Sequence, residues 1–138
     1  FGLVETKGPQ IMVAGGTGLA PMLAMLDTLR TRPGPKPPIV LCFGCNTADD
    51  LFYLNEIELR TFWMPTLRAL TALMERPVAG FDGRIGTVVS LLDDSDCARA
   101  DATAYLCGPP AIIEAARARL IAGGVSPAAI HAEQFRAT

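Results

Sequence analysis

The chain has 138 residues, half of them hydrophobic, and its 12 basic and 14 acidic residues give a formal net charge of −2. A domain near this length buries roughly 68% of its unfolded surface, enough for an ordinary core, which argues against disorder. Because Lys and Arg form no cluster, neither nucleic acid nor an anionic membrane is expected as a partner. No apolar stretch approaches the length of a membrane span.

The first half of the chain alternates strand-like and helix-like patterns. Residues 10–15 (QIMVAG) predict a buried strand, and over residues 18–31 apolar side chains recur at the spacing of one helix face. The Pro- and Gly-rich segment 32–38 predicts a stiff loop. A second strand is expected over residues 39–44. A helix follows it over residues 49–60, with Asp49 or Asp50 as its cap.

The middle of the chain has weaker patterns. A third strand is expected over residues 63–70, although Pro65 interrupts it and its alternation is poor. Residues 74–83 are expected to form a loop, and residues 86–92 to start a short helix.

The last part of the chain returns to clear patterns. Residues 103–107 (TAYLC) predict a fourth strand, and residues 110–122 a helix that Gly123 and Gly124 end. Residues 130–135 alternate apolar and polar side chains and predict a final strand. Strands that alternate with helices pair in parallel through right-handed crossovers. We therefore predict an α/β fold: a doubly wound, five-stranded parallel sheet with helices on both faces.

The four cysteines include a C-x-x-C pair, Cys42 and Cys45, which leaves metal or redox chemistry as an alternative. Zinc needs a second ligand pair, but Cys97 and Cys107 are far apart in sequence and His131 is the single histidine. We expect no metal site. The cysteines are expected to be buried and reduced, as in a cytoplasmic protein.

The strongest local signal is the turn after the first strand, which contains Gly15, Gly16, Thr17, Gly18 and Pro21. Glycines let the backbone approach a bulky anion, and the next helix directs free N–H groups and its positive dipole end to the same place, which suits a pyrophosphate. A tight turn in any α/β protein is the alternative. This turn also differs from the usual dinucleotide-binding fingerprint. Pro21 stands in place of the third small residue of that fingerprint, and no acidic residue ends the second strand.

The fourth strand ends in Cys107, Gly108, Pro109 and Pro110. In a doubly wound sheet the first and fourth strands flank the point where strand order reverses, and ligands bind there, outside the carboxyl ends of the strands. We therefore expect the turn at Thr17 and the end of this strand to face one crevice.

At these residues the sequence resembles the ferredoxin–NADP reductase superfamily, and most of all the reductase components of bacterial mono- and dioxygenases. The matching residues run along nearly the whole chain: Gly15-Gly16-Thr17-Gly18-Leu19-Ala20-Pro21, Gly44, Asp50-Leu51-Phe52-Tyr53, Glu56, Ala69-Leu70-Thr71, Asp82-Gly83-Arg84-x-Gly86-x-Val88, Tyr105-Leu106-Cys107-Gly108-Pro109-Pro110, Gly124-Val125, Ile130 and Glu133-Gln134-Phe135. Each match is weak by itself, but together they are specific.

The resemblance implies hydride transfer from NADH to FAD, with the FAD on a flavin domain of the same parent chain. Electrons would pass on through an iron–sulfur centre to an oxygenase or a ferredoxin. Residues 1–9 would be the end of the flavin domain and a linker, and residues 10–138 the NAD(P)-binding domain. This piece alone is expected to be nearly inactive, because it lacks the flavin domain.

The resemblance also implies roles for single residues. The pyrophosphate and the ribose beside it would lie on residues 16–18 of the turn after the first strand, called the glycine turn below. Gly108, Pro109 and Pro110 would shape the path of the dinucleotide. Cys107 would lie against the nicotinamide, and Glu133 and Phe135 would form the junction with the flavin. Hydride transfer needs two rings held in contact with water excluded, and a thiol and an aromatic ring suit such a wall. Cys107 as a covalent nucleophile is the less favoured alternative, because no histidine is near it in sequence.

Thr71 and Asn46 are candidates for the adenosine end of the site. Plant-type NADP-binding relatives place an Arg directly after the residue that matches Thr71, but this chain has Ala72 there. A 2′-phosphate favours a bidentate Arg, so NADH is predicted rather than NADPH. The alternatives are a non-catalytic nucleotide-sensing domain and another reductase of the superfamily, such as an NADPH-dependent flavodoxin or ferredoxin reductase, a nitrate-type reductase or a dihydroorotate dehydrogenase subunit.

Overall fold

The computed structural model describes residues 3, 8–45, 52–73, 84–85, 87–98 and 101–134. In chain order the helices and strands are β1 (Gln10–Gly15), η1 (Gly16–Gly18), α1 (Leu19–Thr31), β2 (Ile39–Cys45), α2 (Phe52–Trp63), β3 (Leu67–Leu73), β4 (Arg84–Ile85), η3 (Val88–Leu91), α3 (Asp94–Cys97), β5 (Thr103–Gly108), α4 (Pro110–Gly123), η4 (Pro127–Ala129) and β6 (Ile130–Gln134).

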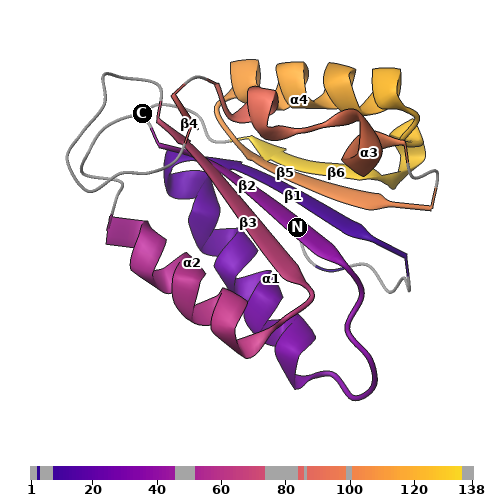
Figure 1. The fold of residues 1–138 in the computed structure, drawn as a ribbon. Helices are drawn as coiled ribbons and strands as arrows, with labels where there is room; N and C mark the ends of the chain where they lie inside the picture. The colour runs from indigo at the N-terminus through magenta and orange to yellow at the C-terminus, as the bar shows by residue number, and fades with distance from the viewer. Residues whose placement is uncertain are drawn as a thin grey trace.

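The strands form one sheet in the order β4-β3-β2-β1-β5-β6, and every pairing in it is parallel. Helices α1 and α2 cover one face of the sheet, and α3 and α4 cover the other (Figure 1). This confirms the predicted doubly wound α/β fold. The two-residue β4, which the sequence did not predict, extends the five expected strands at the edge beside β3.

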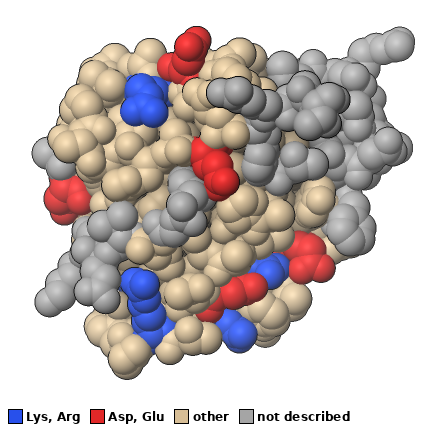
Figure 2. All heavy atoms as spheres, turned by 180° about the vertical axis from the view of Figure 1, so that it is seen from behind, with Lys and Arg blue, Asp and Glu red and all other residues tan. Residues whose placement is uncertain are grey.

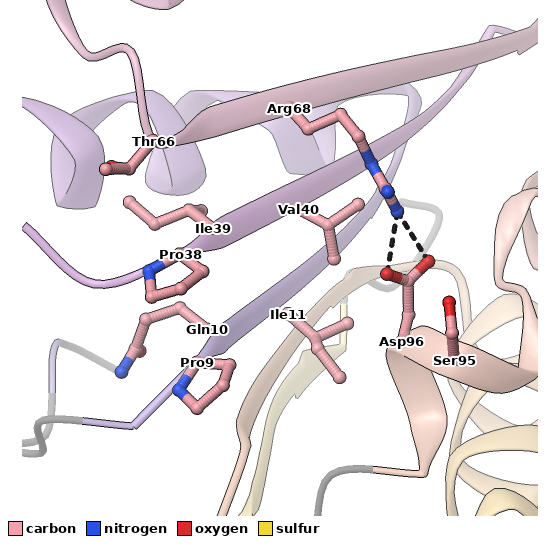
Figure 3. A pocket seen from close by; sticks show the side chains of 10 residues that line it. All are labelled: Pro9, Gln10, Ile11, Pro38, Ile39, Val40, Thr66, Arg68, Ser95 and Asp96. Carbon is pink, nitrogen blue, oxygen red and sulfur yellow. Dashed lines mark hydrogen bonds and ion pairs between the residues drawn. The ribbon is translucent and has the colours of Figure 1, made fainter.

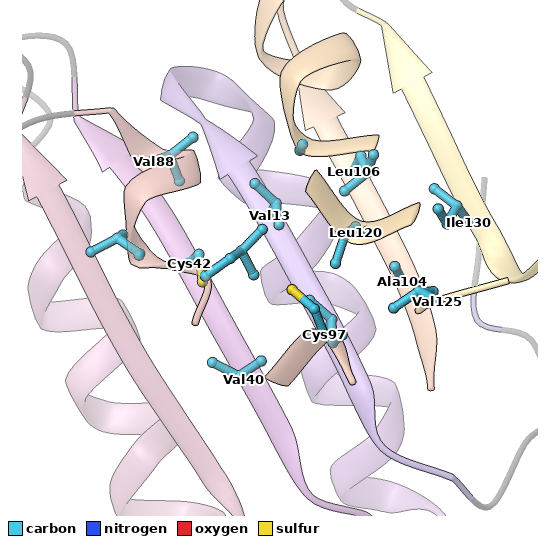
Figure 4. Close-up of a cluster of buried hydrophobic side chains, with 14 of the residues drawn as sticks. Val13, Val40, Cys42, Val88, Cys97, Ala104, Leu106, Leu120, Val125 and Ile130 are labelled. Carbon is cyan, nitrogen blue, oxygen red and sulfur yellow. The ribbon is translucent and has the colours of Figure 1, made fainter. Parts of the chain in front are cut away.

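Alternation along the central strand divides the buried side chains between two core clusters. On β1, Met12 and Ala14 pack towards α1, whereas Ile11 and Val13 pack towards α4. Figure 4 shows the α4 cluster, in which Cys42 and Cys97 lie among aliphatic side chains. Because β1 is buried on both faces, it is apolar from Ile11 to Ala14, as is typical of the centre of a parallel sheet.

The third strand begins later than predicted. Trp63 ends α2, and the backbone N–H of Met64 donates to the carbonyl oxygen of Arg60, which continues the helical pattern by one residue. Pro65 lies in the turn that follows, and β3 runs from Leu67 to Leu73. Pro65 therefore marks a turn before the strand and not an interruption within it, because proline cannot donate to the ladder of a central strand.

The other predicted elements agree within a few residues wherever they are described. Residues 86–92 contribute the 3₁₀ helix η3, and α3 follows it because the Asp93 carboxylate accepts a hydrogen bond from the N–H of Asp96. Gly124, with φ of 121°, ends α4. The predicted cap at Asp49 or Asp50 and the loop over residues 74–83 lie outside the described residues. Within the described part of the chain, no helix has both the length and the apolar character needed to cross a bilayer.

Candidate functional site

The order of the strands reverses between β1 and β5, the two strands that the sequence predicted to flank this point. β1 pairs with β2 on one side and with β5 on the other, and Ala14 is the register partner of Cys107. Both strands therefore end at the same edge of the sheet. The glycine turn that follows β1 and the Cys107–Pro110 segment that ends β5 meet there, at the position where doubly wound folds bind ligands.

Gly18 touches the end of β5 so closely that no other residue fits. A Cβ atom on Gly18 would overlap the carbonyl oxygen of Cys107 and would lie 2.7 Å from its carbonyl carbon. The obstructing atoms belong to a buried backbone and cannot turn aside as a side chain could. Gly18 itself has φ of −62°, so the close approach, and not its backbone conformation, requires glycine.

The second contact between the two segments runs from β5 back to β1. A Cβ atom on Gly108 would lie 3.3 Å from both the nitrogen and the oxygen of Gly15, and Gly108 has φ of 149°. Both the space and the backbone conformation thus favour glycine here. The glycine turn and the Cys107–Pro110 segment are therefore in direct backbone contact.

Two helices begin at this edge without a side-chain cap. Gly18 is the N-cap of α1 and Pro109 is the N-cap of α4, and no described side chain accepts a hydrogen bond at either end. Neither first turn contains an acidic residue. Pro21 lies in the first turn of α1, and Pro110 is the first residue of α4. The positive ends of two helix dipoles therefore face the region where an anionic pyrophosphate would lie.

Cys107 is a poor nucleophile in this environment. The residue is only 1% exposed, and burial, followed by the negative charge of Glu133, raises the pKa of its thiol to about 11. Thiolate is the reactive form of cysteine, so the thiol is unreactive at neutral pH. This agrees with the preference for an orienting role over a covalent one. The described residues Cys42 and Cys97 are likewise free and buried.

The last strand places Glu133 beside Cys107 on the neighbouring strand, and Glu133 is exposed. His131, two residues earlier, is half-buried and stacks on Tyr105 with ring centroids 5.7 Å apart. His131 is thus a packed strand residue. Phe135, the predicted aromatic partner of Glu133, lies outside the described residues.

The adenosine end of the predicted site is described only in part. Thr71 is half-buried on β3, in register with Phe43 of β2, whereas Asn46 lies outside the described residues. Ala72 is fully buried in the α4 core cluster. An arginine at position 72 would have to enter that core. The lack of an arginine at position 72 is therefore a weaker argument for NADH over NADPH than the sequence alone indicated.

A cavity of about 300 Å³ lies at the opposite edge of the sheet, where β1, β2 and β3 begin (Figure 3). Its lining includes Ile11, Val40 and the Arg68–Asp96 ion pair, whose atoms are 2.7 Å apart. Because it faces the amino ends of the strands, it lies away from the glycine turn, which follows the carboxyl end of β1. On the face of the molecule shown in Figure 2, Lys and Arg are scattered among Asp and Glu. The described residues contain no cluster of metal-ligating side chains.

A parallel α/β sheet with a glycine-rich turn at its switch point defines the class of nucleotide-binding domains. Comparison with known families makes this more specific. The family model of the oxidoreductase NAD-binding domain matches residues 12–118, and the chain belongs to this family.

Its relatives include subunits of bacterial oxygenase systems. The electron transfer component of 2-halobenzoate 1,2-dioxygenase from Burkholderia cepacia is 32% identical, and the match covers 100% of this chain and 40% of that protein. The reductase component of the naphthalene 1,2-dioxygenase/salicylate 5-hydroxylase systems from Ralstonia sp. is 34% identical over 93% of this chain and 38% of that protein. The chain thus spans about two fifths of the length of these relatives.

Among solved structures, the cytochrome P450 reductase GcoB from Amycolatopsis has a TM-score of 0.81 and 30% identity, covering 95% of this chain and 38% of that one. The cytochrome b5 reductase domain of nitrate reductase from Ulva prolifera has a TM-score of 0.76 and 25% identity, covering 94% and 51% of the two chains. The predicted resemblance to the ferredoxin–NADP reductase superfamily is confirmed.

The sequence did not identify the side chains that pack over two of the glycines, Ile112 over Gly15 and Val88 over Gly44. A Cβ atom on Gly15 would lie 2.7 Å from Cδ1 of Ile112, and one on Gly44 would lie 2.8 Å from Cβ of Val88. Gly15 and Gly44 are register partners on adjacent strands. Glycines at the ends of two successive buried strands were a usable signal for close packing, but the sequence could not tell which side chains lie over them.

Proposed function

We propose that this chain is the NADH-binding domain of a flavin-dependent reductase. The contact between Gly18 and the carbonyl group of Cys107 carries the proposal, because it brings an anion-binding turn and the thiol-bearing strand end to one edge of the sheet. The two uncapped helix N-termini at this edge suit the two phosphates of a dinucleotide. The relatives' names as reductase and electron transfer components support the same assignment.

Each residue group has a distinct task in this proposal. Gly16, Thr17 and Gly18 bind the pyrophosphate and the neighbouring ribose, and Gly108 with the two prolines after it directs the chain of the dinucleotide along the crevice. When bound, the nicotinamide supplies a hydride to N5 of an FAD held by a separate domain. Cys107 borders the nicotinamide and excludes water, and Glu133 and Phe135 lie at the junction with the flavin. Orientation and exclusion of water, rather than acid–base chemistry, are what this domain contributes.

The remaining assignments concern the parent protein. We propose that residues 1–9 link this domain, residues 10–138, to the flavin domain. Electrons then reach an oxygenase or a ferredoxin through an iron–sulfur centre elsewhere in the system. The names of the relatives, which include dioxygenase systems and ferredoxin, support these acceptors. Free buried cysteines are typical of the reducing cytoplasm, where we place the protein.

Calorimetric titration of the folded 138-residue chain with NADH and with NADPH tests the proposal. We expect saturable binding of NADH and weaker binding of NADPH. The chain mixed with free FAD should oxidise NADH at a negligible rate, whereas the full-length parent protein should reduce its own flavin when NADH is added. A correctly folded chain that binds neither nucleotide would contradict the proposal.

A further inference from the structure

The side chain of Ile112 covers the end of the central strand. Ile112 lies in the first turn of α4, directly after the Cys107–Pro110 segment, and it packs against the α4 core cluster. A Cβ atom on Gly15 would lie 2.7 Å from Cδ1 and 3.8 Å from Cγ2 of Ile112, and 3.5 Å from Cδ of Pro109. Ile112 therefore rests on the backbone of Gly15 where the glycine turn begins.

Ile112 also belongs to the segment that carries Cys107. Its backbone N–H donates to the carbonyl oxygen of Pro109 over 3.1 Å, as does the N–H of Ile113 over 3.2 Å. The strand end, the two prolines and the first turn of α4 are thus one continuous piece. The side chain of Ile112 packs this piece against the glycine turn.

Two other contacts between the two segments are made by backbone atoms. Gly18 meets the carbonyl group of Cys107, and Gly108 meets the backbone of Gly15. Neither contact has a side chain that could be shortened. Ile112, in contrast, contacts the turn through its side chain. A substitution can therefore shorten that side chain and leave the glycines unchanged.

We infer that Ile112 is a positioning residue for the dinucleotide: it fixes the distance between the glycine turn and the Cys107–Pro110 segment. This inference rests on the proposed function, in which the first segment binds the pyrophosphate half and the second borders the nicotinamide half. A ligand that bridges both segments benefits only if their separation is fixed before it binds. A shift of one segment by a fraction of an ångström would reduce that benefit while leaving each segment intact.

Binding of two ligands separates this role from simple support of the turn. ADP-ribose contains the pyrophosphate half without the nicotinamide, whereas NADH reaches both segments. We expect Ile112→Ala to raise the Kd of NADH about tenfold and to change the Kd of ADP-ribose by less than about twofold. Ile112→Leu, which keeps a side chain of the same size over the turn, should restore most of the loss. Calorimetric titration of the folded 138-residue chain and its variants measures both constants.

Two isoleucines of the same helix are matched controls. Ile113 is 2% exposed and belongs to the core, while the side-chain atoms nearest to Gly15 belong to Ile112 and Pro109. Ile113→Val shortens a core side chain one position further on, so it should lower the melting temperature without changing either Kd. Ile121 is 41% exposed near the other end of α4, and Ile121→Ala should change neither property.

The outcomes are distinct. Equal weakening of NADH and ADP-ribose by Ile112→Ala would overturn the inference, because Ile112 would then only support the turn. An unchanged Kd for NADH, or the same selective loss in Ile113→Val, would overturn it as well. If wild-type protein bound NADH and ADP-ribose equally well, the inference would fall while dinucleotide binding stood. If it bound neither, the proposed function would fall first and the inference with it.

Discussion

Cys107 and Glu133 are register partners on the parallel strands β5 and β6, and the carboxylate adds to the effect of burial on the thiol. The pKa of Cys107 is raised from 9.0 to about 11, with burial as the larger cause. Between these two pH values the unfolded chain releases the thiol proton and the folded chain keeps it. Rising pH therefore favours unfolding in this window. The stability that the protonated Cys107 thiol contributes is fully present below pH 9 and is lost as the pH rises towards 11.

This predicts that wild-type protein loses stability between pH 9 and pH 11 faster than Cys107→Ala does, by at most about 1.4 kcal/mol per pH unit. Urea unfolding of both proteins across this range measures the difference. The pKa of Cys42 is raised to about 12, mainly by burial. Its effect on stability is the same in wild type and in Cys107→Ala, so it does not contribute to the difference between them. Glu133→Gln should lower the pKa of the Cys107 thiol by only part of the shift. Parallel stability curves for wild type and Cys107→Ala would contradict this account.

Gly18→Ala is predicted to abolish NADH binding and to destabilise the fold. The new methyl group would overlap the carbonyl oxygen of Cys107, so the ends of β1 and β5 would have to separate. Overpacking of this kind costs about 1–3 kcal/mol. Nucleotide titration and thermal unfolding measure the two effects.

Gly34→Ala is the matched control for that substitution. Gly34 has φ of 93° and open space around its Cα, so alanine there meets backbone strain without overlap. It should cost about 1 kcal/mol of stability and leave NADH binding intact. Loss of binding in both variants would mean that binding merely follows stability.

The sequence predicted the fold well where apolar periodicity was strong. The buried strand at residues 10–15 and the helices after the first and fourth strands agree with the structure to within about one residue at most of their ends. The third strand was misplaced, because Pro65 was taken as a break inside a strand when it closes the turn after α2. Local pattern cannot separate these cases when an apolar helix end, here Trp63 and Met64, runs directly into the turn.

The site was predictable at the level of segments and not at the level of contacts. Spacing and strand order were enough to bring the glycine turn to the end of the fourth strand. The seating of Ile112 on Gly15 depends on the depth at which α4 packs, and the fit of Gly18 on a carbonyl group depends on the register of two strands. Sequence alone specifies neither quantity.

Arg60 links the two helices on one face of the sheet. Its guanidinium donates to Asp27 of α1 through Nε over 3.0 Å and Nη2 over 2.9 Å, and to Glu56 of α2 through Nη1 over 3.0 Å. The Arg60 side chain is 11% exposed, so this network is better shielded than a surface pair. Asp27 and Glu56 are 45% and 44% exposed and stay solvated, so Arg60→Ala should cost about 1 kcal/mol in urea unfolding.

Arg119 supplies the comparison for Arg60. It pairs with Asp94, whose side chain is 99% exposed, and such surface pairs contribute little. Arg119→Ala should therefore cost less than about 0.5 kcal/mol. Arg60→Lys should lose part of the stability, because lysine cannot make the two parallel bonds to Asp27. Equal losses for Arg60→Ala and Arg119→Ala would show that shielding does not matter here.

Gly123→Ala reverses the usual sign of a glycine-to-alanine change in a helix. Gly123 is the last residue of α4, where alanine would normally add up to about 1 kcal/mol. Here the new Cβ would overlap Cβ of the fully buried Cys97 and lie 3.4 Å from its Cα, so we expect a net loss of about 1–2 kcal/mol.

A double-mutant cycle with Cys97 tests this cause. Cys97→Ala keeps the Cβ atom that obstructs position 123, so it should not relieve the cost of Gly123→Ala. Cys97→Gly removes that atom, and the second substitution should then be neutral or stabilising, with a coupling of at least about 1 kcal/mol. Equal coupling for both Cys97 variants would contradict the proposed overlap, because only one of them clears the space between α3 and the end of α4.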